Sequence, residues 1–183
     1  MRADIKIGCL VFIASFLATA VRAEDTSVRT YPLPGHGVLQ MAVPLSWMDE
    51  IRQPPYDLPP TISMRPREGN EFLVMITPLW NMSEDDFSSD AKLKSLVDMD
   101  RQAMAPSAVE EELELVALKG PNARGYYFIA TDRAPKPGEW KYAMRAGVAT
   151  GQLLLSVTVL TNDKESAVIA DALEMIRSAR HHR

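Results

Sequence analysis

The sequence predicts an α+β fold in which an antiparallel sheet of about six to seven strands packs against a long central helix and a C-terminal amphipathic helix. Three observations support this prediction. Several short segments alternate apolar and polar residues and are separated by turn residues. Two longer segments repeat apolar residues with helical spacing. The last four strand segments follow one another through short connections, which favours an antiparallel meander.

The first strands come from the segment before the central helix. Residues 38–43 form a strand whose apolar residues share one face, and Pro44 ends it. Residues 61–65 and 71–79 flank residues 66–70, which have the composition of a hairpin turn. The second of these strands is apolar on both faces, which indicates a central strand covered on both sides.

The central helix is predicted to run from Ser83 to Ala105. Ser83 supplies a capping hydroxyl, and the acidic residues that follow suit the positive end of a helix. Apolar residues then fall on one side of the helix, and Pro106 closes it.

Four further strands and the final helix complete the domain. The strands are predicted at residues 113–118, 124–132, 139–148 and 152–161. Asn162 is a suitable cap for the last helix, and Glu165 three residues later completes a capping box. The apolar stripe of that helix predicts that it is buried against the sheet; it consists of Val168, Ile169, Ala172, Leu173 and Ile176.

The N-terminus has the pattern of a secretory signal peptide. Arg2 and Lys6 precede an apolar run at residues 7–20, and small residues end at Ala23, with Ala20 as the alternative cleavage site. The run is shorter than the roughly 20 residues of a transmembrane helix. We therefore predict a signal peptide at residues 1–23, no transmembrane anchor after cleavage, and a periplasmic or secreted protein with a single domain at residues 24–183.

Charge and cysteine content exclude several functions. The full chain carries a net charge of −4, and removal of residues 1–23, which hold three basic residues and one acidic residue, leaves −6. An acidic surface argues against nucleic acid as a partner. Cys9, the only cysteine, lies within the signal peptide, so the mature chain forms no disulfide and has no thiolate nucleophile.

No catalytic or cofactor-binding constellation is recognisable. His36 lies between two glycines in a predicted loop, and His181 and His182 lie in a tail predicted to be frayed and solvated. The methionines form no copper-binding cluster, and the acidic run at residues 110–112 lacks the spacing of a calcium loop. The sequence thus predicts no enzyme, no metal site and no cofactor.

One surface has the composition of a protein interface. The segment around the proline-rich loop at residues 133–138 is rich in aromatic and basic side chains, which are enriched in interfaces. A proline-rich loop also loses little entropy on binding. The candidate interaction residues are Tyr127, Arg133, Lys136, Trp140, Lys141 and Arg145. The alternative is that these residues form an ordinary buried stripe and a solvated strand face.

The order of elements, with Val43-Pro44-Leu45-Ser46-Trp47 ending a strand and Gly125-Tyr126-Tyr127-Phe128 inside the meander, resembles the PsbP-like group, which includes periplasmic DcrB-type proteins. The resemblance covers nearly the whole mature chain. It implies a helix-covered antiparallel sheet and an accessory or assembly role without catalytic residues. The chain departs from DcrB-type members because it lacks a lipoprotein cysteine at the cleavage site.

Two functions remain open at this point. The first is a non-catalytic accessory or assembly protein of the bacterial periplasm that binds another envelope protein. The alternative is a carrier of a small apolar molecule or lipid, with a pocket between sheet and helix near Trp47 and Trp80.

Overall fold

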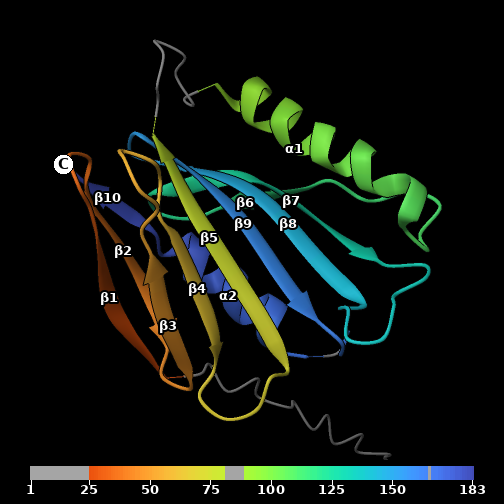
Figure 1. Cartoon of the computed structure of the whole chain (residues 1–183). Coiled ribbons are helices and arrows are strands. Elements are labelled where there is room, and N and C mark those ends of the chain that lie inside the picture. Colours follow the sequence, from red (N-terminus) through yellow and green to blue (C-terminus); the bar gives the residue numbers. More distant parts are fainter. Residues whose placement is uncertain (1–24, 81–88, 165) are drawn as a thin grey trace, which may run out of the picture.

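The structure is a computed structural model that describes residues 25–80, 89–164 and 166–183. Within these residues the chain is mostly β, with ten strands in two sheets and two α-helices (Figure 1). The predicted α+β architecture, one sheet against a long central helix and a C-terminal helix, is therefore wrong. The predicted signal peptide and the predicted helix start at Ser83 lie outside the described residues.

The larger sheet has seven antiparallel strands. They are β3 (Trp47–Arg52), β4 (Thr61–Pro66), β5 (Phe72–Trp80), β6 (Val116–Lys119), β7 (Ala123–Thr131), β8 (Tyr142–Thr150) and β9 (Leu153–Thr161). Their order is β3-β4-β5-β9-β8-β7-β6. The chain leaves the sheet after β5, re-enters at the far edge as β6 and returns strand by strand until β9 pairs with β5. The predicted meander is thus present, and its last strand, β9, pairs with β5 of the predicted hairpin.

The smaller sheet brings the two ends of the domain together. It consists of β1 (Thr26–Leu33), β2 (Gly37–Pro44) and β10 (Arg180–His182), with β2 in the centre. His181 pairs with Leu39 of β2. The C-terminal residues predicted to be a frayed tail therefore form an edge strand.

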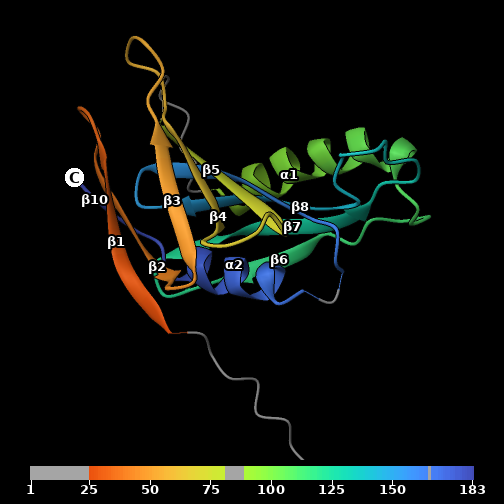
Figure 2. The ribbon, with the colours of Figure 1, turned by 60° about the horizontal axis from the view of Figure 1, so that its bottom comes forward.

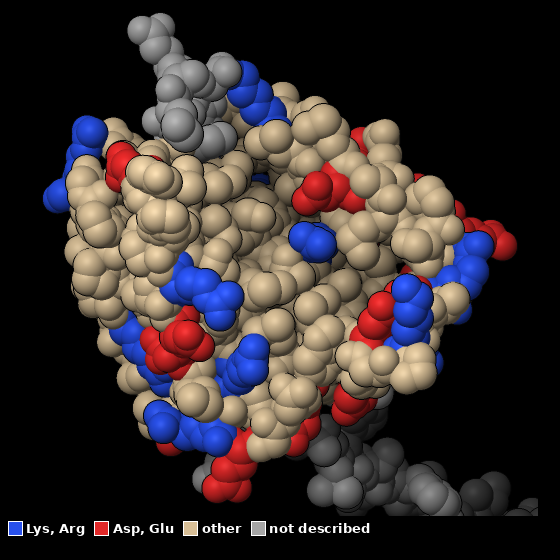
Figure 3. Space-filling model, viewed as in Figure 1, with Lys and Arg blue, Asp and Glu red and all other residues tan. Residues whose placement is uncertain are grey.

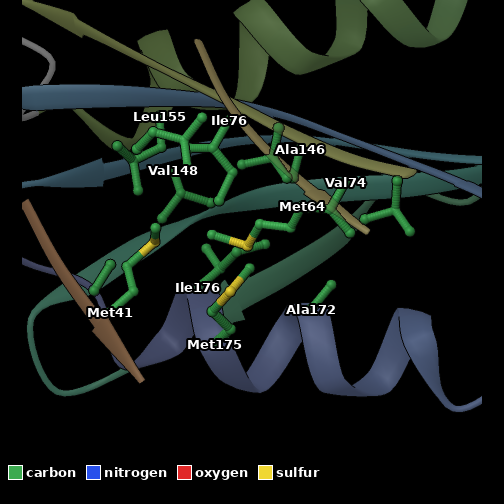
Figure 4. Close-up of a cluster of buried hydrophobic side chains, with 14 of the residues drawn as sticks. Met41, Met64, Val74, Ile76, Ala146, Val148, Leu155, Ala172, Met175 and Ile176 are labelled. Carbon is green, nitrogen blue, oxygen red and sulfur yellow. The ribbon is translucent and has the colours of Figure 1, made fainter. Parts of the chain in front are cut away.

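Helix α2 (Val168–Arg177) lies on the inner face of the large sheet, next to β2 of the small sheet (Figure 2). Met175 and Ile176 point from this helix toward Met64 of β4 and Val148 of β8 in the main core (Figure 4). Buried methionines from four different elements belong to this core, as expected of a flexible side chain that fills irregular gaps. Stability here comes from the burial of apolar side chains between the two sheets and the helix.

Helix α2 starts differently from the prediction. Its N-cap is Ala167, which makes no side-chain capping bond. Asn162, the predicted cap, instead accepts a hydrogen bond from the backbone N–H of Lys141 at 2.8 Å. Both roles use the same short acceptor side chain, so sequence alone did not distinguish them.

Helix α1 (Asp90–Met104) lies on the opposite, outer face of the large sheet (Figure 2). Ser89 caps it by accepting a hydrogen bond from the N–H of Lys92 at 3.5 Å. Its buried residues Leu93 and Val97 pack over β7 and β8. It ends in a short 3-10 helix, η1 (Ala105–Ser107), which contains the predicted stop Pro106.

Helix α1 packs mainly over β7 and β8 and leaves much of the same face of β5 and β9 beside it. Leu73, Met75 and Thr77 of β5 are half-buried there, whereas Leu79 packs against the cluster that contains Leu93 of α1. Lys, Arg, Asp and Glu side chains are few and scattered over the middle of this face (Figure 3). Neither helix in the described part of the chain has the length and hydrophobicity that a membrane crossing requires.

Candidate binding site

A cavity of about 250 Å³ lies where the C-terminal end of α1 meets the outer face of the large sheet. Its residues come from the end of α1, the segment after it, the end of β7, the β7–β8 loop, β8 and β9. They are Met104, Ser107, Ala108, Ala130, Thr131, Asp132, Glu139, Trp140, Lys141, Ala143, Arg145 and Leu160. We call this cavity the Arg145 pocket.

One wall of the Arg145 pocket is held to β7 by hydrogen bonds. The backbone N–H of Val109 donates to the carbonyl of Thr131 at 2.8 Å, and Ala108 forms a bridge with Asp132. The carboxylate of Glu110 accepts from the Thr131 backbone N–H at 2.9 Å and from its hydroxyl at 2.6 Å. The segment that follows α1 is therefore fixed against the sheet rather than free to move away from the cavity.

The pKa of Glu110 reflects this arrangement. Its partial burial favours the neutral acid, but the two hydrogen bonds from Thr131 favour the carboxylate and lower the pKa below its usual value. Glu110 therefore holds the wall as an ion rather than as a neutral acid at neutral pH.

The rim of the pocket is the β7–β8 loop, which is closed by its own hydrogen bonds. The N–H of Glu139 donates to the carbonyl of Lys136 at 2.9 Å, and the N–H of Lys136 donates to the Glu139 carboxylate at 2.9 Å. Gly138 has a φ of 86°, a conformation that glycine adopts without strain. With the backbone N–H of Lys141 held by Asn162, the loop brings Trp140 into the lining of the cavity.

Arg145 lies on the floor of the pocket, in β8, the third strand of the meander. Its partners on the neighbouring strands are Phe128 of β7 and Thr158 of β9. Its Nε is buried and has no hydrogen-bond partner within the described part of the chain. A buried donor without a partner is rare and costly, so this guanidinium is the most unusual polar group of the site.

The structure brings together three of the six predicted interaction residues: Trp140, Lys141 and Arg145 all line the pocket. Lys136 is close by on the loop, highly exposed, with its Nζ 3.9 Å from Glu139. The remaining two have other positions. Arg133 uses its Nη2 to bind the carbonyl of Ala108 at 2.6 Å, and Tyr127 packs against the main core on the opposite face.

Other pocket residues were not found by sequence reasoning. Met104, Ala143 and Leu160 provide apolar lining, and Glu139 lies on the rim. No local pattern identifies them, because they meet only through the packing of α1 on the sheet. The alternation of β8 does place Ala143 and Arg145 on one face, which is the one signal that was available.

A second cavity, of about 560 Å³, follows the flank of α1. Here Arg101 donates to Asp98 at 2.7 Å and to the carbonyl of Leu113 at 3.1 Å. The hydrogen bond from Arg101 lowers the pKa of Asp98. Its arginine is thus already bound within the chain, unlike Arg145.

The two tryptophans suggested for a carrier pocket do not line either cavity. Trp47 is buried in the main core, where its ring centroid lies 4.8 Å from that of Phe72. Trp80 stacks on His36 with 3.9 Å between centroids. Among the described residues there is no cluster of three or more metal-ligating side chains.

Comparisons with known proteins do not indicate a function for this site. Neither the models of known protein families nor the curated proteins give a match to this chain. Among solved structures, a crystal structure of a protein from Bacteroides thetaiotaomicron aligns with a TM-score of 0.45 and 12% identity over 79% of this chain and 45% of that one. This chain thus spans less than half of that protein, and a likeness at this level carries no argument about function.

Proposed function

We propose that the protein is a non-catalytic accessory protein that binds another protein of the bacterial envelope through the Arg145 pocket and its rim. The observation that carries the proposal is the partly buried guanidinium of Arg145 beside Trp140 and Lys141, whose Nε has no hydrogen-bond partner among the residues that the structure describes. Aromatic and arginine side chains that meet in one depression are the usual anchors of protein interfaces.

Two further observations favour a protein partner over a carried small molecule. The volume of the Arg145 pocket itself, about 250 Å³, is below the roughly 300–1,000 Å³ of pockets that enclose drug-sized ligands, whereas the larger cavity along α1 has its arginine already bound within the chain. The floor residue Leu160 belongs to β9, next to the half-buried face of β5, so a partner has a larger surface to contact beside the pocket. A protein segment can fill the pocket and contact this neighbouring surface at the same time.

The cellular setting of the proposal rests on the sequence. The signal-peptide pattern of residues 1–23 supports an envelope location, whereas no family model supports the resemblance to the PsbP-like group. A carrier of a small apolar ligand remains the competing function, and the experiment below separates the two.

The test is capture of partners from intact cells by the full chain. A photo-crosslinking amino acid replaces the exposed Lys136 beside the pocket, and crosslinked species are identified by mass spectrometry. The charge reversal Lys141→Glu is then compared with Lys119→Glu, because Lys119 is also exposed but pairs with Arg124 at the start of β7, whereas the pocket borders the end of β7 at Thr131.

We expect Lys141→Glu to reduce the yield of one crosslinked protein by about tenfold, since rim charges steer association, and Lys119→Glu to leave it unchanged. Equal yields for both variants would contradict the assignment of this surface. Native mass spectrometry that finds a stoichiometric small molecule in place of a protein would favour the carrier instead.

A further inference from the structure

The Arg145 pocket contains a cation to which the described residues offer no acceptor. Within the described part of the chain, the guanidinium of Arg145 makes no ion pair or hydrogen bond, and its Nε is shielded from solvent. We propose that the pocket binds the carboxylate of a glutamate or aspartate side chain of the partner protein, an inference that rests on the proposed function.

The acidic residues of the pocket are already engaged elsewhere. One Asp132 carboxylate oxygen accepts from the N–H of Ala134 at 2.9 Å. Glu139 accepts from the N–H of Lys136 and lies near the Lys136 ammonium. Both carboxylates therefore serve the β7–β8 loop, and no described residue supplies an acceptor to Arg145.

The surroundings of Arg145 favour a carboxylate on a short apolar stem. Guanidinium groups bind carboxylates through two parallel hydrogen bonds, and this pairing is stronger where water is excluded. Met104, Ala143 and Leu160 provide apolar contacts for the methylene groups of the incoming side chain. The exposed Lys141 at the rim adds a second positive charge that attracts an acidic segment.

Nuclear magnetic resonance gives a direct test with the unmodified chain. The Nε–H of a buried arginine has its own signal, so the Arg145 side chain reports binding without any substitution. The probe is glutamate blocked at both backbone ends, and the matched control is glutamine blocked in the same way, which has the same shape without the charge.

We expect blocked glutamate to shift the Arg145 Nε–H signal and the Trp140 indole N–H signal saturably, with blocked glutamine weaker by about tenfold or more. Arg145→Lys should retain part of the binding and Arg145→Gln should lose it. An Arg145 signal that blocked glutamate leaves unmoved would overturn the inference. An equal response to chloride or inorganic phosphate would overturn it too, because it indicates unspecific attraction of anions.

The two proposals fail in different ways. If Lys141→Glu prevents protein capture but blocked glutamate does not bind, the surface is an interface and the carboxylate inference is wrong. If blocked glutamate binds but capture does not depend on Lys141, the carboxylate site stands and its use in a protein interface is wrong. Tight binding of a free carboxylate from the cell, seen by native mass spectrometry, would overturn a partner side chain as the source.

Discussion

Thr131 donates two hydrogen bonds to the carboxylate of Glu110, one from its backbone N–H at 2.9 Å and one from its hydroxyl at 2.6 Å. This pair joins the segment after α1 to the end of β7 and so fixes one wall of the Arg145 pocket. The hydrogen bonds outweigh partial burial and lower the pKa of Glu110. A lowered pKa in the folded state means that the bond stabilises the fold above the pKa of the unfolded chain, about 4.3 for glutamate.

Glu110→Gln should therefore lower the free energy of unfolding by about 1 kcal/mol at neutral pH, the usual net value of a hydrogen bond. The difference from the unmodified chain should shrink as pH falls below about 4. There Glu110 itself becomes protonated and loses the negative charge that strengthens its hydrogen bonds from Thr131. Urea unfolding at several pH values measures this. Glu111→Gln is the control, because that neighbour is exposed, and a loss that is the same at every pH would contradict the role of the charge.

The position of α1 on the sheet depends on the absence of a side chain at residue 147. A Cβ added at Gly147 of β8 would lie 2.7 Å from Cγ2 of Val97 in α1. We expect Gly147→Ala to destabilise the fold by about 1–3 kcal/mol, because the helix has to move or the core becomes strained. Urea unfolding measures the loss.

A double variant shows whether the loss comes from this contact. Val97→Ala removes the obstructing methyl group, so Gly147→Ala combined with Val97→Ala should lose less stability than the sum of the two single variants. Ser156→Ala serves as the control, because Ser156 pairs with Gly147 on the neighbouring strand but is exposed. Additive losses would mean that Gly147 matters for another reason.

Local sequence patterns were sufficient for the centre of the large sheet. The strands β4, β5, β7, β8 and β9 and the order of the meander followed from alternation, turn residues and short connections. Strands β1 and β3 lacked such signals, since β1 contains Pro32 and β3 exposes five of its six residues. The pairing of β10 with β2 joins the two ends of the domain, so no local pattern predicts it.

The candidate site likewise contains some residues that local sequence predicted and others that only the fold brings together. The aromatic and basic composition around residues 133–145 identified three side chains that meet in the pocket. Met104 and Leu160 were missed because helix packing and strand order, not sequence spacing, bring them together. Sequence could not predict the unpartnered Nε of Arg145 either, since only the three-dimensional positions of the described acceptors reveal that none of them binds it.

Tyr126 of β7 is coupled to the first residue of α1. Its hydroxyl donates to the carboxylate of Asp90 at 2.7 Å, and this hydrogen bond raises the pKa of Tyr126 above its ordinary value of about 10. Ionisation of the tyrosine breaks the bond, so its stabilising effect is present at neutral pH and is lost as pH rises through the raised pKa.

We expect Asp90→Asn to shift the ionisation of one tyrosine to lower pH, which ultraviolet absorbance titration detects. Tyr126→Phe assigns the shifted signal, because the variant lacks that phenol. The pKa of Tyr31 is raised as well, first by burial, but it should not change in Asp90→Asn. Titration curves that are the same with and without Asp90 would contradict the coupling.

His181 connects the C-terminal strand to two turns at the same end of the molecule. Its Nδ1 accepts from the N–H of Gln152 in the β8–β9 turn at 3.2 Å. Its Nε2 lies 2.7 Å from the carbonyl oxygen of His36 in the β1–β2 turn, and because a carbonyl only accepts, Nε2 carries the proton. The imidazole thus replaces water for two backbone groups and holds β10 in place.

His181→Ala should leave both backbone groups without this partner and destabilise the fold by about 1–2 kcal/mol. His182→Ala is the matched control, because the neighbouring imidazole is exposed and should contribute little. Amide hydrogen exchange along β2 at residues 38–40 is the sharper measurement, since β10 pairs there and should open more often only in His181→Ala. Equal exchange in the two variants would show that the strand is held by its backbone pairing alone.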